Sequence, residues 1–123
     1  MNIYYDFHIH SCLSPCGDDD NTPNNIVNMA LIKGLNAIAL SDHNTGKNCP
    51  ATIAAGKKNG LVVLPAMELT TSEDIHVLCL LEKYEQLAAL EEYIAPRRMQ
   101  IKNREEIFEI GRASCRERVL QYV

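Results

Sequence analysis

The sequence predicts an α/β fold, and three observations favour it. Apolar runs of strand length alternate with segments of helical periodicity, the connections between them are short, and polar residues follow the ends of the apolar runs. Strands that alternate with helices in this way are typical of a parallel sheet covered by helices. The 123 residues and the 46% apolar content suit one globular domain.

The first expected strand ends in two histidines, in the run IYYDFHIH at residues 3–10. Because side chains alternate along a strand, Asp6, His8 and His10 are expected on one face and Phe7 and Ile9 on the other. Two imidazoles at this spacing can point at one metal ion. The pair taken alone also fits surface or hydrogen-bonded histidines.

The next segment predicts a helix with clear end signals. Thr22 is placed as the N-cap, Pro23 at the first helical position and Gly34 at the end. Residues 35–44, LNAIALSDHN, then predict a short strand with a polar carboxyl end.

The middle of the chain repeats this alternation. A helix is expected from near Pro50 to Asn59 and Gly60, followed by a nearly all-apolar strand at 61–69 and a fourth strand at 75–81. Residues 82–95 predict an amphipathic helix, and residues 103–110 the start of another.

The chemistry-bearing residues gather at the expected strand ends. Sites in parallel α/β folds form at the carboxyl ends of strands. Every histidine in the chain lies on or beside an expected strand end, with His76 at the start of the fourth strand, and two acidic residues join them. The set is His8, His10, Asp42, His43, Glu68 and His76. This joint pattern predicts a metal site.

Four segments, DFHIHS, SDHN, PAMEL and IHVL, together resemble the polymerase and histidinol phosphatase (PHP) superfamily between Asp6 and Leu80. The resemblance implies a distorted seven-stranded β/α barrel of the TIM-like kind, of which this chain would form the incomplete N-terminal part. It also implies metal-dependent hydrolysis of phosphomonoesters or phosphodiesters.

The resemblance further implies roles for the residues in these segments. His8 and His10 would bind one metal, Glu68 would bridge two metals, His76 would bind the second and His43 a third. Asp42 would orient a ligand histidine, so Glu68 and Asp42 are the expected catalytic residues. Two or three divalent ions of zinc, manganese or iron suit these ligands. No side-chain nucleophile is then needed, and Ser11 and Ser41 lie in no nucleophile-elbow context.

The sequence departs from the family pattern in the loop after the first strand and beyond His76. Pro15 stands where many relatives carry an acidic ligand, and we take Asp18 as its substitute, although the run Asp18–Asp20 also fits a solvated turn. No histidine follows His76, so the family's C-terminal ligands have no counterpart here.

Residues 110–119, IGRASCRERV, look like the translation of a sequencing adapter. We therefore expect residues 1–109 to be the N-terminal portion of a PHP domain and 110–123 a non-native read-through tail. Phosphoesterase activity is expected in the full-length parent. The alternatives are an inactive truncated fragment or a non-catalytic metal-binding or interaction module.

Composition restricts the partners and the location. The formal net charge of −4 argues against an extended nucleic-acid surface, which leaves a small phosphorylated substrate or a nucleotide. Lys47 is a candidate for contacting a substrate phosphate, or a solvated loop lysine. There is no run of about 18 apolar residues and no signal-peptide pattern, so no membrane contact and a cytoplasmic location are expected.

The five cysteines are expected to be reduced, because their number is odd and no secretory signal is present. Cys12, Cys16 and Cys49 fall in loops at the expected metal end of the sheet. They fit small loop-packing residues, or a thiolate-bound metal or redox role.

Overall fold

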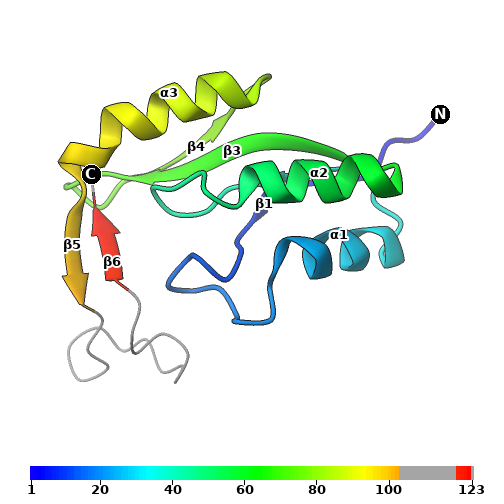
Figure 1. Ribbon diagram of the computed structural model, residues 1–123, viewed down its shortest axis with the longest axis horizontal. Helices are drawn as coiled ribbons and strands as arrows, with labels where there is room; N and C mark the ends of the chain where they lie inside the picture. The colour runs from blue at the N-terminus through cyan, green and yellow to red at the C-terminus, as the bar shows by residue number, and fades with distance from the viewer. Residues whose placement is uncertain (103–118, 123) are drawn as a thin grey trace.

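The computed structural model describes residues 1–102 and 119–122. Its main sheet has the strand order β1-β2-β3-β4. Figure 1 labels β1, β3 and β4 of this sheet and the helices α1, α2 and α3. The strands are β1 (Tyr5–Ile9), β2 (Ala37–Leu40), β3 (Val62–Thr70) and β4 (His76–Leu80). The helices are α1 (Pro23–Ile32), α2 (Cys49–Asn59), α3 (Tyr84–Ile94) and the short 3-10 helix η1 (Ala95–Arg97).

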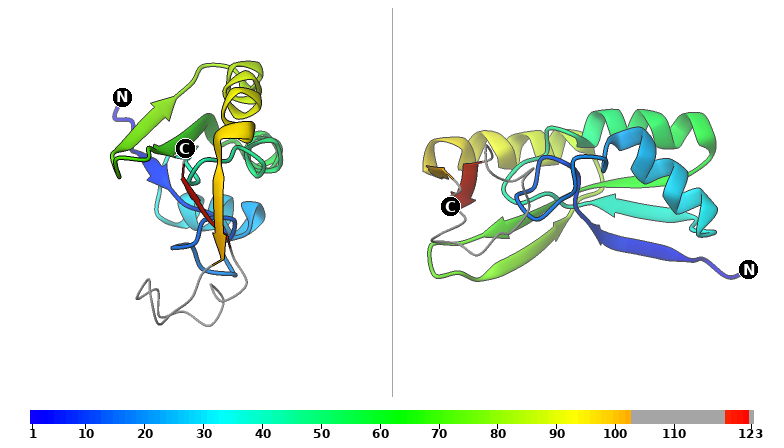
Figure 2. Two further views of the ribbon diagram at one scale, coloured as in Figure 1. Left: turned by 90° about the vertical axis from the view of Figure 1, so that its left-hand side faces the viewer. Right: turned by 90° about the horizontal axis from the view of Figure 1, so that it is seen from below.

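The first three strands confirm the predicted parallel arrangement. β1 pairs with β2 and β2 with β3 in parallel, with α1 and α2 as the crossover helices. The helices lie on one side of the sheet, which curls as half of a barrel would (Figure 2). The described residues place four strands in this sheet, and the seven strands of a whole barrel stay a prediction.

The prediction of a wholly parallel sheet was wrong at β4, which pairs antiparallel with β3. A parallel crossover needs a dozen or more residues, and the connection at 71–75 is a tight turn in which the Thr71 amide donates to the Ile75 carbonyl. The antiparallel direction puts His76, the first residue of β4, opposite Thr70, the last residue of β3. His76 therefore lies at the edge where the parallel strands end.

The helix boundaries follow the signals in the sequence. Thr22 caps α1, and its side chain accepts a hydrogen bond from the Asn25 amide. Gly34 and Gly60 follow α1 and α2 with φ angles of 76° and 75°, which favour glycine. α2 begins one residue before Pro50, at Cys49.

The hydrophobic core lies between the sheet and the helices. Its largest fully buried apolar side chains are Val27, Ile38, Leu40, Met67, Leu87 and Ile94. α2 approaches β3 closely at Gly56, where an added Cβ would meet Val63 Cγ2 at 2.5 Å and the Leu61 carbonyl oxygen at 2.7 Å. Burial of these side chains fixes the strands, and with them the strand ends that carry the site.

A second, two-stranded antiparallel sheet joins β5 (Met99–Lys102) and β6 (Val119–Tyr122). β6 falls within the 110–123 range that the sequence marks as a read-through tail, and the non-native origin of that range stays a prediction. The helix expected at 103–110 lies outside the described residues.

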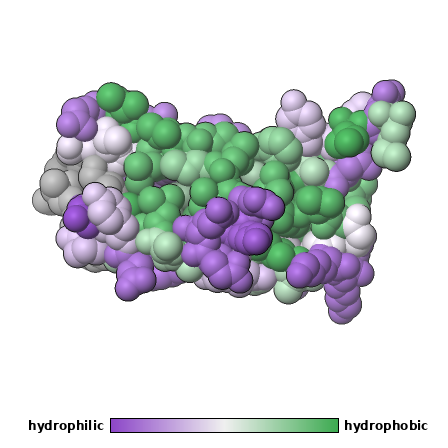
Figure 3. Space-filling model, turned by 90° about the horizontal axis from the view of Figure 1, so that it is seen from above, coloured by the Kyte–Doolittle hydropathy of each residue, from purple (hydrophilic) through white to green (hydrophobic). Residues whose placement is uncertain are grey.

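Hydrophobic residues cover much of the face shown in Figure 3. On β4, Val77, Leu78 and Leu80 are between 39% and 43% exposed. An open half barrel leaves such strand side chains uncovered. No helix in the described part of the chain has the length and apolar character needed to cross a membrane.

Candidate metal centre

Four imidazoles surround one carboxylate, that of Glu68, near the end of β3. Glu68 Oε2 lies 2.7 Å from His10 Nε2, 2.8 Å from His8 Nε2 and 3.7 Å from His43 Nε2. Glu68 Oε1 lies 2.9 Å from His76 Nδ1. The Glu68 side chain is only 7% exposed, so these contacts form at a largely buried carboxylate.

β1 supplies two of the imidazoles, and their contacts with Glu68 confirm that His8 and His10 share a face. Asp6 does not join them in this cluster. It lines a separate hollow, and its Oδ1 accepts a hydrogen bond from the His8 amide.

His43 is positioned by an extension of the β2–β3 pairing beyond the end of β2. The Glu68 amide donates to the Asp42 carbonyl at 3.0 Å, and the Asn44 amide donates to the Glu68 carbonyl at 3.0 Å. His43 and Glu68 thus form an isolated parallel bridge. Asn44, with a φ of 52°, ends the extension, and its side-chain oxygen accepts from the Thr70 amide.

Thr70 contacts the other side of the His43 ring, with its Oγ1 at 3.1 Å from His43 Nδ1. This contact leaves His43 Nε2 facing Glu68. Sequence reasoning missed Thr70 and Asn44. The signal for Thr70 was its position two residues after Glu68 on one strand, which gives both side chains the same face.

Asp42 is buried, at 1% exposure, and its carboxylate holds the loop that follows β1. It accepts hydrogen bonds from the Ser11 amide at 2.6 Å, the Ser11 hydroxyl at 2.6 Å and the Ser14 hydroxyl at 2.7 Å. The Ser14 oxygen in turn accepts from the His43 amide at 3.1 Å. These contacts position the backbone beside His10 and His43, whereas the sequence led us to expect a contact with a ligand imidazole.

The protonation states of Glu68 and His43 favour metal ligation. Burial acts to raise the pKa of Glu68, but the hydrogen bonds with His8 and His76 outweigh it and hold the pKa at about 2. Burial, with the nearby His10, lowers the pKa of His43. The hydrogen bond with Glu68 raises the pKa of His76. At neutral pH the centre therefore offers an ionised carboxylate and a neutral His43, as ligation requires.

The donor atoms fit a metal centre. The ligand atoms of His8, His10 and Glu68 lie within 4.8 Å of one another, as do those of His43, Glu68 and His76. Among the described residues, His10 Nε2 is a buried nitrogen without hydrogen-bond geometry, despite its 2.7 Å approach to Glu68. Imidazole and carboxylate donors suit zinc, manganese or iron, and Glu68 belongs to both groups.

The model of the PHP domain family matches residues 6–113, which is most of the chain. The chain belongs to the PHP family. The family model thus spans the strands that carry the centre, and it extends beyond the 109 boundary expected from the sequence.

Two relatives share close to a third of their aligned residues with this PHP domain. A 5′-3′ exoribonuclease of Haemophilus influenzae (strain ATCC 51907 / DSM 11121 / KW20 / Rd) is 32% identical over 81 residues, which cover 63% of this chain and 28% of that protein. A solved structure from Bifidobacterium adolescentis, assigned provisionally as a metal-dependent phosphoesterase, is 31% identical with a TM-score of 0.53. That match covers 65% of this chain and 27% of the other.

A third comparison supports the fold alone. An amidohydrolase from Chromobacterium violaceum, solved with bound sulfate and no metal, is 24% identical with a TM-score of 0.57, over 79% of this chain and 34% of that one. The PHP chain described here thus spans about a third or less of the length of these three relatives.

Two predicted residues of this PHP domain lie apart from the imidazoles. Asp18 is exposed, its Oδ1 accepts a hydrogen bond from the Asp20 amide, and it belongs to none of the candidate ligand groups. Lys47 is exposed and lines a hollow beside α3 with Glu91 and Arg98. A contact between Lys47 and a substrate stays a prediction.

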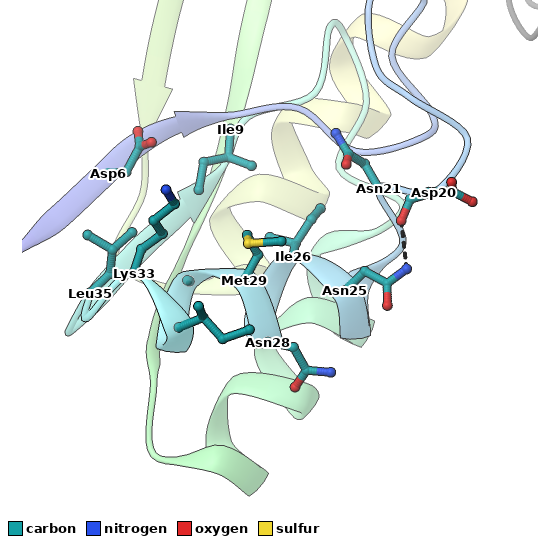
Figure 4. Close-up of a pocket in the computed structure, with 12 residues that line it drawn as sticks. Asp6, Ile9, Asp20, Asn21, Asn25, Ile26, Asn28, Met29, Lys33 and Leu35 are labelled. Atoms are coloured by element: carbon teal, nitrogen blue, oxygen red, sulfur yellow. Dashed lines mark hydrogen bonds between the residues drawn. The ribbon is translucent and has the colours of Figure 1, made fainter.

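The hollow that Asp6 and Ile9 line lies between β1 and α1 and has a volume of about 490 Å³ (Figure 4). Met29 and Lys33 of α1 also line it, and none of the four histidines does. The candidate ligand groups therefore lie at the strand ends, outside this hollow.

Proposed function

We propose that this PHP domain is the N-terminal part of a metal-dependent phosphoesterase that hydrolyses phosphomonoesters or phosphodiesters. Family membership and the relative assigned as a phosphoesterase support metal-dependent phosphoester hydrolysis in general. The observation that carries the proposal is the Glu68 carboxylate, which is shared by two groups of potential ligands. A shared carboxylate is what closely spaced metals in a phosphoryl-transfer site need.

When bound, two or three ions of zinc, manganese or iron would supply Lewis acidity and an acidified water for phosphoryl transfer. The residues of the chain would bind and orient these ions. Glu68 remains ionised far below neutral pH, Thr70 fixes the ring of His43, and Asp42 fixes the loop beside His10. Asp42 thus acts as a positioning residue, while Glu68, His8, His10, His43 and His76 are the proposed ligands.

The proposed substrate is a small phosphate ester or a nucleotide. The net charge of −4 supports a small substrate over a long nucleic acid. The exoribonuclease relative adds the end of an RNA strand as a phosphodiester candidate. Lys47 is the proposed point charge for a substrate phosphate.

The test is hydrolysis by the metal-loaded chain. We would assay p-nitrophenyl phosphate, bis-p-nitrophenyl phosphate and a short 5′-phosphorylated oligoribonucleotide, with zinc, manganese or iron and with a chelator. We expect slow, metal-dependent hydrolysis of at least one ester that falls by a factor of about 10² in Glu68→Gln. Metal retention without hydrolysis of any of the three would contradict activity in this chain and favour the inactive truncated fragment or the non-catalytic metal-binding module.

A further inference from the structure

Cys16 brings a sulfur atom to the edge of the metal centre. Its Sγ lies 2.9 Å from His10 Nδ1, whereas the other ring nitrogen of His10, Nε2, faces Glu68. The ligand atoms of His10, Cys16 and His43 all lie within 4.8 Å of one another. The sulfur of Cys16 and the imidazoles of His10 and His43 are thus close enough together to contact one ion beside the carboxylate cluster.

The loop that carries Cys16 is held in place by its own backbone. The Ser14 amide donates to the Ser11 carbonyl and the Gly17 amide donates to the Ser14 carbonyl, while the Ser11 hydroxyl is bound to Asp42. A Cβ at Gly17 would lie 2.0 Å from the Ser11 carbonyl oxygen, so only glycine permits this closure. The position of Cys16 beside His10 is therefore set by the fold of the loop.

The other cysteines near this end of the sheet have different surroundings. Cys49 is 1% exposed and its thiol donates to the Leu40 and Ala66 carbonyls at 3.5 and 3.6 Å. Cys12 is half-buried, and its sulfur accepts a weak hydrogen bond from Asn48. Of the cysteines that the structure describes, only Cys16 belongs to a candidate ligand group. Its side chain is exposed and therefore accessible to an ion.

We propose that the Cys16 thiolate is a metal ligand, together with His10 and His43, at a sulfur-containing position of the centre. This inference rests on the metal centre of the proposed function and deepens it. Thiolate ligands favour zinc and iron over manganese, so this position would select its metal through sulfur. Cys16, rather than Asp18, is then the ligand that the loop after β1 contributes.

Cobalt(II) is the probe that tests the ligand directly, because a cobalt–thiolate bond gives a charge-transfer absorption in the near ultraviolet. We would load the metal-free full chain with cobalt under reducing conditions, beside Cys16→Ser and the matched control Cys12→Ser. Circular dichroism and the bound cobalt content would be measured on each sample. We expect the band in the wild-type chain and in Cys12→Ser, and its loss in Cys16→Ser.

A wild-type chain that retains cobalt without the band would overturn the inference and leave the phosphoesterase proposal intact. A band that survives in Cys16→Ser, or one lost in Cys12→Ser instead, would also overturn it. A chain that retains no cobalt would overturn both the inference and the metal centre. A band without hydrolysis of any ester would support the sulfur ligand and contradict only phosphoesterase activity in this chain.

Zinc X-ray absorption on the wild-type chain keeps the inference testable if Cys16→Ser does not fold. A sulfur scatterer at about 2.3 Å is expected in addition to nitrogen and oxygen neighbours at about 2.0–2.2 Å. A shell fitted by nitrogen and oxygen alone would overturn the inference.

Discussion

The hydroxyl of Thr70 lies 3.1 Å from Nδ1 of His43, on the side of the ring away from Glu68. A hydrogen bond at one ring nitrogen sets the tautomer and the orientation of the other, which is how metal-ligating imidazoles are commonly held. Thr70 is 4% exposed, so water competes little for this contact.

Replacing Thr70 is therefore expected to weaken metal binding without removing a ligand. We expect Thr70→Val to lower metal affinity roughly 10- to 100-fold, measured by competition with a chelating dye. Thr70→Ser keeps the hydroxyl and should restore most of the affinity. Equal affinities in the Val and Ser variants would show that the hydroxyl has no such role.

Asp42→Asn should destabilise the chain, because a buried acceptor of three hydrogen bonds becomes partly a donor. We expect a loss of about 1–3 kcal/mol in the free energy of unfolding, measured in urea. Ser14→Ala removes one of the same hydrogen bonds, so the two changes should couple in a double-mutant cycle. Strictly additive effects would contradict the assigned network.

Glu91 links α3 to the loop that follows His43. Its carboxylate accepts hydrogen bonds from the Gly46 amide at 2.8 Å, the Thr45 hydroxyl at 3.2 Å and Arg98 at 3.1 Å. We expect Glu91→Gln to cost about 1–2 kcal/mol of unfolding free energy. The neighbouring Glu92 is exposed, and Glu92→Gln should change stability little. Similar losses in both variants would refute the link.

Glu68 makes the stability of the metal-free chain depend on pH. Its pKa falls from 4.5 to about 2, so the ionised carboxylate stabilises the folded state by an amount on the order of 3 kcal/mol. Because the folded-state pKa is the lower one, this contribution is complete above pH 4.5 and is lost as the pH falls through about 2.

Urea unfolding of the wild-type chain and Glu68→Gln, both without metal, measures this dependence. The stability difference between the two proteins should grow as the pH falls from neutral and His76 becomes protonated, because the Glu68 carboxylate raises the pKa of that imidazole. It should then close as the pH falls from 4.5 towards 2. A difference that is the same at pH 2 and pH 7 would contradict the assignment.

The sequence predicted most residues of the candidate centre because each is chemically distinctive and stands at a strand end. Histidine and glutamate are recognisable as donors before any contact is known, and parallel pairing brings the ends of β1, β2 and β3 to one edge. That reasoning placed His8, His10, His43 and Glu68 without a structure. It also reached His76, although the reason it gave for that residue was incomplete.

The direction of β4 could not be read from its apolar residues, because a run of them carries no direction. The short connection at 71–75 was the informative feature, since only an antiparallel turn closes over such a length. His76 contacts Glu68 because β4 is antiparallel to β3 and therefore begins at the edge where the parallel strands end.

The supporting residues were harder to predict because their roles arise from register. Thr70, Asn44 and Ser14 are ordinary residue types. Only the way neighbouring segments of the chain pair and pack brings them close to His43 and Glu68. The same is true of Cys16, whose approach to His10 depends on the closed loop at Gly17. Asp18 looked equally suitable from sequence, but its carboxylate contacts its own turn.

The central claim is that His8, His10, His43, Glu68 and His76 form one metal centre. The most direct measurement is metal content by plasma mass spectrometry on the purified chain, beside a His8→Ala/His10→Ala variant of confirmed fold. The account predicts stoichiometric zinc, manganese or iron in the wild-type chain and its loss from the variant. Metal absent from the wild-type chain after loading, or retained equally by the variant, would contradict it.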